Sequence, residues 1–326
     1  MIRISAVICS HNRLHYLPGS IGSLARQDLP PDQFEIILVD NASTDGTGVW
    51  AQEQGPALAR FVYIHEPALG LSNARNTAWR AAKGEIVAFL DDDAIAAPDW
   101  LSKILEKFQH ADSRLAVVGG KVEALWESPP PEWLVPEMWS HLAVVDWSGS
   151  DMVLVEPHFF VGANMAIRKS ALEQVGGFNS LLGRKGKKLL SNEEIHLKRQ
   201  LEEAGFYALY APEVFVRHSI PAERMTPEWF FRRYYWQGVS DSAMQQVVSP
   251  RARGFVPWLR SCVRNLRSTR ALVTRWYRHR LSRRGRNRSI AVKCLDYYHW
   301  GRLAEDWRNC IDFGDVSTGG KQGYSA

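Results

Sequence analysis

Apolar residues in the first third of the chain fall into short, nearly continuous runs that alternate with segments of helical spacing. The runs are Ile4–Cys9, Phe34–Val39, Phe61–His65 and Ile86–Leu90, and the helical segments are 18–27, 45–54 and 70–83. A short run that is apolar on both faces predicts a buried strand, and a helix after each strand predicts parallel pairing. We therefore predict an α/β fold with a mostly parallel central sheet flanked by helices.

The pattern continues less regularly to about residue 240. We predict helices at 99–110, 170–175 and 192–205, strands at 115–118, 157–167 and 206–217, and a loop in the Pro- and Trp-rich segment 128–133. Pro212 is expected to divide the last of these strands in two, because proline donates no hydrogen bond to a ladder. Residues 1–240 are thus expected to form one domain.

Charge adds a second region to this picture. The 326 residues are 45% hydrophobic and 23% charged, which is enough apolar material for a substantial core. Residues 1–241 hold 23 Lys and Arg against 30 Asp and Glu, whereas residues 242–295 hold 14 Lys and Arg and no acidic residue. We predict a basic, mainly helical C-terminal extension at 241–316 and a disordered tail at 317–326.

Two features of the sequence concern its cellular location. No window approaches the roughly 20 apolar residues that span a bilayer, and the N-terminal segment is expected to be the first strand rather than a signal peptide. The four cysteines, Cys9, Cys262, Cys294 and Cys310, form no CxxC pair and are expected to be reduced thiols. The chain is therefore expected in the cytoplasm.

Polar clusters follow three of the predicted strands. Ser10, Asn12 and Arg13 follow the first, Asp40 and Asn41 follow the second, and Asp91, Asp92 and Asp93 follow the fourth. Each cluster alone is typical of a loop or a helix cap, since Asn, Ser and Asp favour both. Because the carboxyl ends of parallel strands lie at the edge where such sheets bind ligands, we expect the clusters to form one common site.

The stretch FLDDDAI places three carboxylates, Asp91, Asp92 and Asp93, directly after a buried strand. Adjacent carboxylates raise one another's proton affinity unless a cation or hydrogen bonds compensate. Neighbouring side chains on a strand point to opposite faces, so at most two of the three share one partner. A divalent cation such as Mg²⁺ or Mn²⁺ is one explanation, and an acidic turn that caps the helix near Asp99 is the other.

The acidic pair Glu193 and Glu194 marks a second candidate centre at the start of a predicted helix. The helix dipole alone favours acidic residues there. If the pair faces the cation site, one carboxylate serves as the general base that takes a proton from an attacking hydroxyl. His218 follows an apolar strand and is either a further metal ligand or a packed histidine.

Taken together, these segments resemble the family 2 glycosyltransferases with a GT-A fold. The resemblance rests on VICSHNR, ILVDNASTDGT, GLSNARN, FLDDD, GAN, GGF and NEEIHL, followed by the late His218. These eight segments stand in the family's order and at its spacing, and they span roughly residues 3–240. One acidic triplet is weak evidence, but eight ordered segments are specific.

The resemblance implies a metal-dependent, inverting transfer of a sugar from a nucleotide sugar, with a UDP-sugar favoured and Mn²⁺ or Mg²⁺ as cofactor. It implies donor-binding roles for Ser10, Asn12, Arg13, Asp40, Asn41, Arg75, Asp91, Asp92, Gly162 and Asn164, metal ligation by Asp93 and His218, and catalysis by Glu194 or Glu193. Asp40 would contact the nucleobase and Asp92 the ribose, and Gly162 and Asn164 would lie beneath the donor sugar. Asp91 is left with a supporting role.

The acidic pair departs from the family's usual Glu-Asp. The second member is the base in such enzymes, so Glu194 is the expected base here. Glu is one methylene longer than Asp, which changes where the acceptor hydroxyl must lie and leaves Glu193 open as the alternative. The acceptor implied by the resemblance is a glycan or a lipid-linked saccharide in bacterial polysaccharide biosynthesis.

The basic segment leaves further readings open. Between Arg251 and Arg288 stand thirteen Arg, interleaved with apolar and aromatic residues. Such a segment suits an anionic membrane surface, in this case the inner face of the cell membrane, but it also suits a packed helical extension or nucleic acid. The competing functions are therefore a metal-dependent nucleotidyltransferase and a nucleic-acid-binding protein.

Overall fold

The computed structural model describes residues 1–249, residue 263 and residues 285–311. Contacts divide the chain into two compact units. The first unit comprises Met1–Pro130, Val135–Lys188 and Glu193–Ala222, and the second comprises Pro131–Leu134, Leu189–Asn192 and the chain from Glu223 onward. The domain limit predicted at residue 240 lies within a helix of the second unit.

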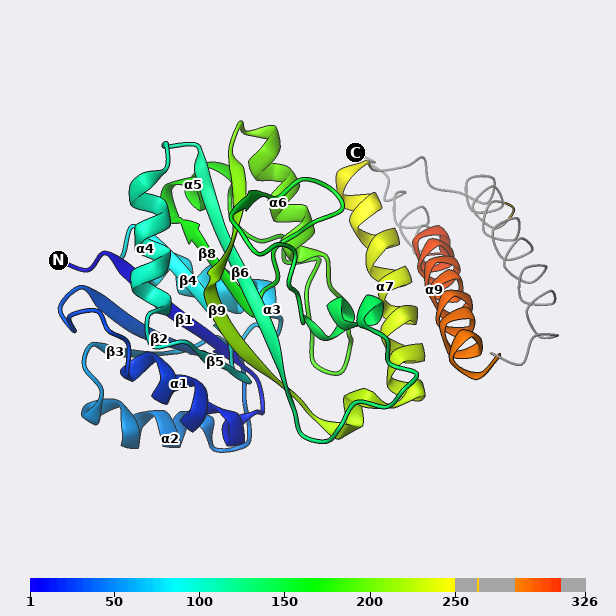
Figure 1. The fold of residues 1–326 in the computed structure, drawn as a ribbon, viewed down its shortest axis with the longest axis horizontal. Helices are drawn as coiled ribbons and strands as arrows, with labels where there is room; N and C mark the ends of the chain where they lie inside the picture. The colour runs from blue at the N-terminus through cyan, green and yellow to red at the C-terminus, as the bar shows by residue number, and fades with distance from the viewer. Residues whose placement is uncertain (250–262, 264–284, 312–326) are drawn as a thin grey trace, which may run out of the picture. The chain divides into compact units, whose positions relative to one another are not determined.

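The first unit is built on one nine-stranded sheet (Figure 1). The strands are β1 (Ile4–Ser10), β2 (Phe34–Asp40), β3 (Phe61–His65), β4 (Ile86–Asp91), β5 (Ala94–Ala96), β6 (Leu115–Trp126), β7 (Met152–Val153), β8 (Asn164–Arg168) and β9 (Tyr207–Ile220). Their order is β3-β2-β1-β4-β8-β6-β9-β5, with β7 also paired to β9. All except β5, β7 and β8 run in one direction, which confirms the mostly parallel sheet.

Two apolar cores lie on opposite faces of this sheet, because successive side chains of each strand alternate between the faces. In β1, Ile4 and Ile8 belong to one core and Val7 to the other. The first core is covered by α1 (Leu17–Ala25), α2 (Thr47–Gln54) and α4 (Trp100–His110), and the second by α3 (Leu71–Ala81), α5 (Lys169–Val175) and α6 (Glu193–Glu203). The predicted helices on both faces of the sheet are therefore confirmed.

Parallel register brings the ends of the first strands to one edge. Ser10 pairs with Asp40 across β1 and β2, and Cys9 pairs with Asp91 across β1 and β4. The polar clusters that follow these strands thus start side by side.

Two strand predictions were wrong in their limits. Of the segment predicted at 157–167, only β8 is strand, and the chain before it turns through a hydrogen bond from Asn164 N to Val161 O of 3.0 Å. The strand predicted at 115–118 continues to Trp126. Its second half is partly exposed and follows Gly119 and Gly120, so the sequence there lacks the continuous apolar signal of the first half.

Pro212 does not divide the last strand. β9 runs unbroken from Tyr207 to Ile220, and its register with β6 shifts between Gly120 and Val122, opposite the segment that contains Pro212. A bulge tolerates proline because the ladder hydrogen bonds are interrupted there in any case.

The second unit contains two long helices, α7 (Pro227–Val248) and α9 (Gly285–Ile311). They approach closely at two glycines: a Cβ on Gly238 would lie 1.9 Å from Tyr298 O, and one on Gly301 would lie 1.8 Å from Tyr235 O. These helices fall in or next to the predicted basic extension. The Arg-rich stretch itself is mostly at 250–262 and 264–284, outside the described residues, as is the tail predicted at 317–326.

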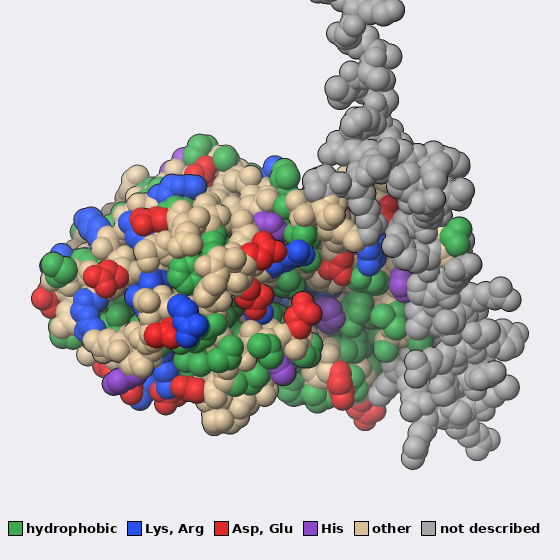
Figure 2. All heavy atoms as spheres, turned by 90° about the horizontal axis from the view of Figure 1, so that it is seen from above, with side chains coloured by type: hydrophobic (Ala, Val, Ile, Leu, Met, Phe, Trp, Pro, Cys, Tyr) green, Lys and Arg blue, Asp and Glu red, His purple; other side chains and the backbone are tan. Residues whose placement is uncertain are grey.

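Short 3₁₀ turns complete the described chain, at Leu14–Tyr16, Gly55–Ala57, Pro136–Leu142 and Ala222–Met225. Among the described helices, none combines the length and the apolar character that a bilayer span requires. On the face drawn in Figure 2, acidic and basic side chains lie interspersed among the coloured residues.

Gly120 is a site where the fold admits no side chain. A Cβ there would lie 1.7 Å from Val214 O and 2.7 Å from Asn164 Nδ2. We expect Gly120→Ala to lower the free energy of unfolding by about 2 kcal/mol or more, because backbone atoms of β9 must move. Gly149→Ala is the matched control, since a Cβ at Gly149 meets nothing within 4 Å. Urea denaturation checks both variants, and equal stabilities would contradict this account of the β6–β9 pairing.

Candidate active site

The loops after β1 and β2 are joined by side-chain hydrogen bonds at the sheet edge. Asn12 N donates to Ser43 Oγ at 3.0 Å, and Asn12 Oδ1 accepts from Thr44 N at 2.7 Å. Asn41 accepts at Oδ1 from Gly70 N at 2.7 Å, which fixes the end of β2 to the start of α3. Asn12 and Asn41, both predicted to bind the donor, therefore hold these loops and the start of α3 together.

Asp40 is buried at the end of β2 and accepts two hydrogen bonds. Oδ1 accepts from Ser43 N at 2.9 Å, and Oδ2 accepts from Tyr63 Oη at 2.9 Å. Burial, followed by the hydrogen bond to Asp40, raises the pKa of Tyr63 to about 12. Tyr63 was not among the predicted site residues. Its place on β3 could have indicated it. This strand pairs with β2, and Asp40 stands opposite His65, two residues after Tyr63.

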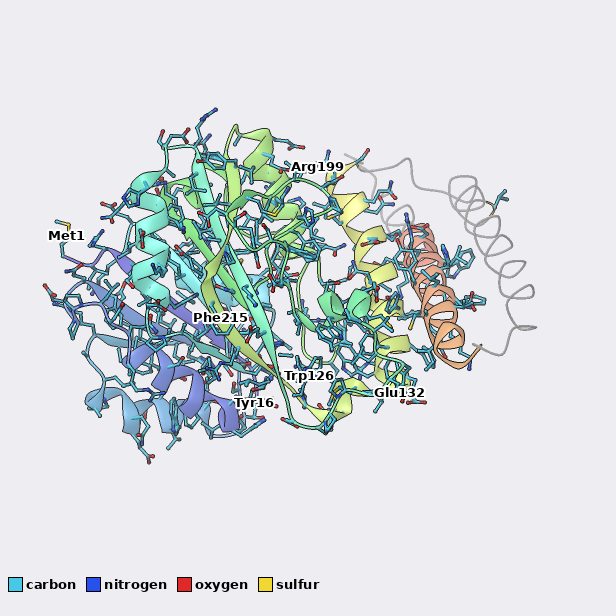
Figure 3. The ribbon with its side chains drawn as sticks, viewed as in Figure 1. Met1, Tyr16, Trp126, Glu132, Arg199 and Phe215 are labelled. Carbon is cyan, nitrogen blue, oxygen red and sulfur yellow. The ribbon has the colours of Figure 1, made fainter. Side chains whose placement is uncertain are left out.

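The three carboxylates of the triplet divide between two sets of partners. Asp92 Oδ2 accepts from Ser10 Oγ at 2.8 Å, and Asp92 Oδ1 lies 3.3 Å from Arg13 Nε. Arg13 also pairs with Asp93. Its guanidinium carbon lies 4.7 Å from the centre of the Tyr16 ring, which is labelled in Figure 3. Ser10, Arg13 and Asp92 thus form one side of the site.

Asp91 and Asp93 point toward a different partner, His218. One ligand atom from each of these three residues lies within 4.8 Å of the others, and Asp93 Oδ1 is 3.0 Å from His218 Nε2. The arrangement follows from β5 pairing with β9, which places Ala94 opposite His218. Two carboxylates are oxygen donors that suit Mn²⁺ and Mg²⁺, and the imidazole suits a transition-metal ion, so the residues together fit Mn²⁺ better than Mg²⁺.

Asp91 and Asp92 hold their protons more tightly than ordinary carboxylates. Burial raises the pKa of Asp92 to about 7; Asp93 and Asp91 add to the rise, and Arg13 and the Ser10 hydrogen bond oppose it. Burial, followed by the charge of Asp93, also raises the pKa of Asp91. Burial disfavours the charged form of Arg13, but Asp92 and Asp93 outweigh this and raise its pKa. Positive charge at this position therefore stabilises the ionised triplet.

Arg75 connects the triplet to the acidic pair on α6. Its Nη1 lies 3.1 Å from Glu193 Oε1 and 3.1 Å from Glu194 Oε1, and its Nη2 lies 3.9 Å from Asp91 Oδ1. Burial works against the charge of Arg75, yet the carboxylates, Glu194 first, raise its pKa. One buried cation thus holds three carboxylates from two distant parts of the sequence.

Gly162 leaves the space that this ion-pair cluster occupies. A Cβ at Gly162 would lie 2.0 Å from Arg75 Nη2 and 2.5 Å from Glu194 Oε1. Any larger residue would displace one of the two charged groups, so glycine is required here for close approach rather than for backbone freedom.

The two glutamates differ in access. The side chain of Glu193 is 3% exposed and that of Glu194 is 17% exposed. Burial, followed by the charge of Glu194, raises the pKa of Glu193 to about 8. Among the residues that the structure describes, Glu193 Oε2 has no hydrogen-bond partner. Glu193 is therefore the buried, proton-retaining member of the pair, and Glu194 is the more exposed member.

Asn164 lies apart from this cluster. Its side chain is fully buried, accepts from Trp100 Nε1 at 2.9 Å and donates to Lys121 O at 3.0 Å and Val214 O at 2.7 Å. These bonds join α4, β6 and β9. The family resemblance implies a place for Asn164 with Gly162 beneath a donor sugar, which stays a prediction; in the structure its side-chain groups bond Trp100, Lys121 and Val214.

The comparisons with known proteins agree with this geometry. The family model described as glycosyl transferase family 2 matches residues 5–176, more than half of the 326-residue chain. The chain belongs to glycosyl transferase family 2. The resemblance read from the eight sequence segments is therefore confirmed, and glycosyl transfer takes precedence over nucleotidyl transfer and nucleic-acid binding.

Curated members of the family match along most of their length. The glucosyl-dolichyl phosphate glucuronosyltransferase of Haloferax volcanii is 26% identical over 254 residues, which are 77% of this chain and 80% of that protein. The succinoglycan biosynthesis protein ExoM of Rhizobium meliloti is 25% identical over 240 residues, 73% of each chain.

A solved structure shares the fold. The mannosyltransferase PcManGT from Pyrobaculum calidifontis, in complex with GDP-Man and Mn²⁺, matches with a TM-score of 0.56 at 19% identity, covering 98% of this chain and 76% of that one. The GT-A fold expected for this family 2 member is thus confirmed.

Replacing Arg75 tests the central ion-pair cluster. We expect Arg75→Ala to lower the free energy of unfolding by about 3–5 kcal/mol, because it leaves buried carboxylates without a counter-charge. Arg80→Ala, on the exposed face of the same helix, is the control and should change stability by less than about 0.5 kcal/mol. Chemical denaturation without added metal gives both values. Equal stability of the two variants would show that Arg75 is not needed to hold the carboxylates.

The raised pKa of Glu193 predicts a pH dependence of stability. The folded protein keeps a proton on Glu193 up to about pH 8, whereas the ordinary value is 4.5. The unfolding free energy therefore falls as pH rises between these values. The side chain of the Glu193→Gln variant is neutral at every pH. We therefore expect the free energy of unfolding to fall less in this variant than in the unmodified chain between pH 5.5 and pH 8, by about 1 kcal/mol or more. Urea denaturation with EDTA at both pH values measures this, and parallel declines would refute the assignment.

Proposed function

We propose that the chain is a metal-dependent, inverting glycosyltransferase that moves a sugar from a nucleotide sugar to a hydroxyl of a glycan or lipid-linked acceptor. The observation that carries the proposal is the ion-pair cluster of Arg75, which joins the acidic pair to Asp91. A candidate base and a candidate cation site are thereby held in one site, as a displacement at a sugar phosphate requires.

The nucleoside of the donor is assigned to the loops after β1 and β2. The buried carboxylate of Asp40 accepts hydrogen bonds and suits the N–H of an imide-bearing base. Asn12 and Asn41 frame this position through their loop contacts, and Asp92, held by Ser10 and Arg13, is assigned to the ribose.

Asp93 and His218 are proposed as metal ligands, and the geometry adds Asp91 to them. Bound there, Mn²⁺ or Mg²⁺ would supply positive charge to the diphosphate that leaves with the nucleoside. Arg13 and Arg75 supply fixed positive charge at the same site. The related mannosyltransferase structure contains Mn²⁺, which supports this choice of ion.

Glu194 is the proposed general base. It takes the proton of the acceptor hydroxyl as the new bond to the sugar carbon forms and the bond to the leaving phosphate oxygen breaks. Its partial exposure supports the assignment, because a base must come within hydrogen-bond reach of the hydroxyl. Glu193 and Arg75 position it, and Gly162 keeps the space beside it open.

UDP-sugar remains the favoured donor, with dTDP- and GDP-sugars as the competing choices. Asp40 accepts from an imide but does not separate uracil from thymine, and the structural relative holds GDP-Man. The acceptor class is drawn from two relatives, one named a glucosyl-dolichyl phosphate glucuronosyltransferase and the other a succinoglycan biosynthesis protein.

Thermal denaturation with nucleotides tests the donor site. We expect one of UDP, GDP, dTDP and CDP, added with Mn²⁺, to raise the melting temperature, since ligand binding to the folded state stabilises it. Asp93→Ala should lose the metal-dependent part of the rise. If no nucleotide stabilises the protein with either Mn²⁺ or Mg²⁺, the donor site is wrong.

Replacing Glu194 tests the base separately. Glu194→Gln should keep the nucleotide and Mn²⁺ stabilisation but lower sugar transfer by about 100-fold or more. The donor in the assay is a labelled nucleotide sugar that carries the base with the largest thermal shift. The assay measures transfer of the labelled sugar to membrane-derived lipids. Glu203→Gln, on the last turn of the same helix, should retain transfer. Full activity of Glu194→Gln would overturn the base assignment.

A further inference from the structure

The loop between α5 and α6 carries a concentration of positive charge that the proposed reaction does not yet use. Its sequence RKGKK places Arg184, Lys185, Lys187 and Lys188 within five residues, and no acidic residue occurs between Gly176 and Asn192. Four like charges so close together repel one another, and an anion brought to them is attracted.

The loop is held in a defined position by the start of α3. Ser72 Oγ donates to Leu182 O at 2.7 Å, and Leu71 N donates to Arg184 O at 2.8 Å. The tip is a tight turn in which Lys188 N donates to Lys185 O at 3.1 Å and Gly186 takes a φ of 55°. The cations are thus presented by a fixed backbone.

This turn begins directly beside the acidic pair. A Cβ on Gly183 would lie 3.3 Å from Glu193 Cδ. Burial raises the pKa of Glu193, and the charge of Arg184 is among those that oppose the rise, so the guanidinium is within electrostatic reach of the pair. The basic turn therefore begins beside Glu193, the buried member of the acidic pair that contains Glu194.

Two of the cations are open to a ligand. Lys185 and Lys188 are exposed, and within the described parts of the chain neither forms an ion pair. Next to the turn, the side chain of Leu181 is 70% exposed. A positive turn beside an exposed apolar side chain suits a phosphate that carries an apolar chain.

We propose that residues 184–188 bind the phosphate group of a lipid-linked acceptor and so orient its sugar hydroxyl toward Glu194. The inference rests on the proposed function, because it takes Glu194 as the base. In the proposed function, the donor phosphates are bound by Arg13 and by the cation that the metal ligands would hold. The basic turn is therefore left for the acceptor.

The double variant Lys185→Gln/Lys188→Gln tests the proposal. Calorimetry measures binding of farnesyl phosphate, farnesol and inorganic phosphate at low salt, with and without nucleotide and Mn²⁺. We expect farnesyl phosphate to bind about fivefold more weakly to the variant, as two exposed charge contacts are lost, with farnesol unaffected. Arg26→Gln/Lys83→Gln removes the same charge from exposed positions elsewhere and should bind farnesyl phosphate like the unmodified chain.

Several results would overturn the inference. Unmodified protein that does not bind farnesyl phosphate, or equal affinity in the Lys185→Gln/Lys188→Gln variant, removes the acceptor role. Inorganic phosphate bound as tightly as farnesyl phosphate indicates a site for a free anion. Loss of the nucleotide and Mn²⁺ thermal shift in the variant assigns the turn to the donor. The proposed function fails by a different result, the absence of any nucleotide stabilisation in the unmodified chain.

Discussion

The site depends on one buried cation. Arg75 projects from α3 to Glu193 and Glu194, which stand more than a hundred residues later in the chain, and to Asp91 at the end of β4. Burying that many carboxylates without a counter-charge would strongly favour their protonated forms. The guanidinium pairs with both glutamates, of which Glu194 is partly exposed and Glu193 is buried. Gly162 is part of the same constraint, since a side chain there would occupy the position of the guanidinium.

A single nine-stranded sheet determines which groups meet. Its parallel half delivers Ser10, Asp40 and Asp91 to one edge by register alone. Its mixed half brings in His218 through an antiparallel contact between β5 and β9. The basic turn is positioned by α3, the helix that also carries Arg75. Both the buried Arg75 and the exposed basic turn are thus held in place by the same helix.

Much of this was predictable because the signals are local. The strands β1 to β4 are buried on both faces, so their apolar runs are continuous, and their loops carry the polar clusters. The triplet's division was predictable only in part: strand alternation indicated that the three carboxylates do not all share one partner. In the structure β4 ends at Asp91, and the turn through Asp92 and Asp93 determines which partners they meet. What the sequence did not reveal depends on contacts between distant segments: Tyr63 on Asp40, Arg75 bridging two acidic sites, and Asn164 bonded to Trp100. The second half of β6 was missed because its exposed positions and paired glycines look like a loop until β9 lies beside it.

The bulge in β9 that contains Pro212 determines more than the shape of the strand. It sets which residue of the strand stands opposite Ala94 and therefore which side chain faces Asp93. A change of one residue in the length of this bulge would bring Arg217 or Ser219 to that place and turn His218 to the other face of the sheet. The identity of the third candidate metal ligand therefore depends on the number of residues in the bulge, which precedes His218 in the chain.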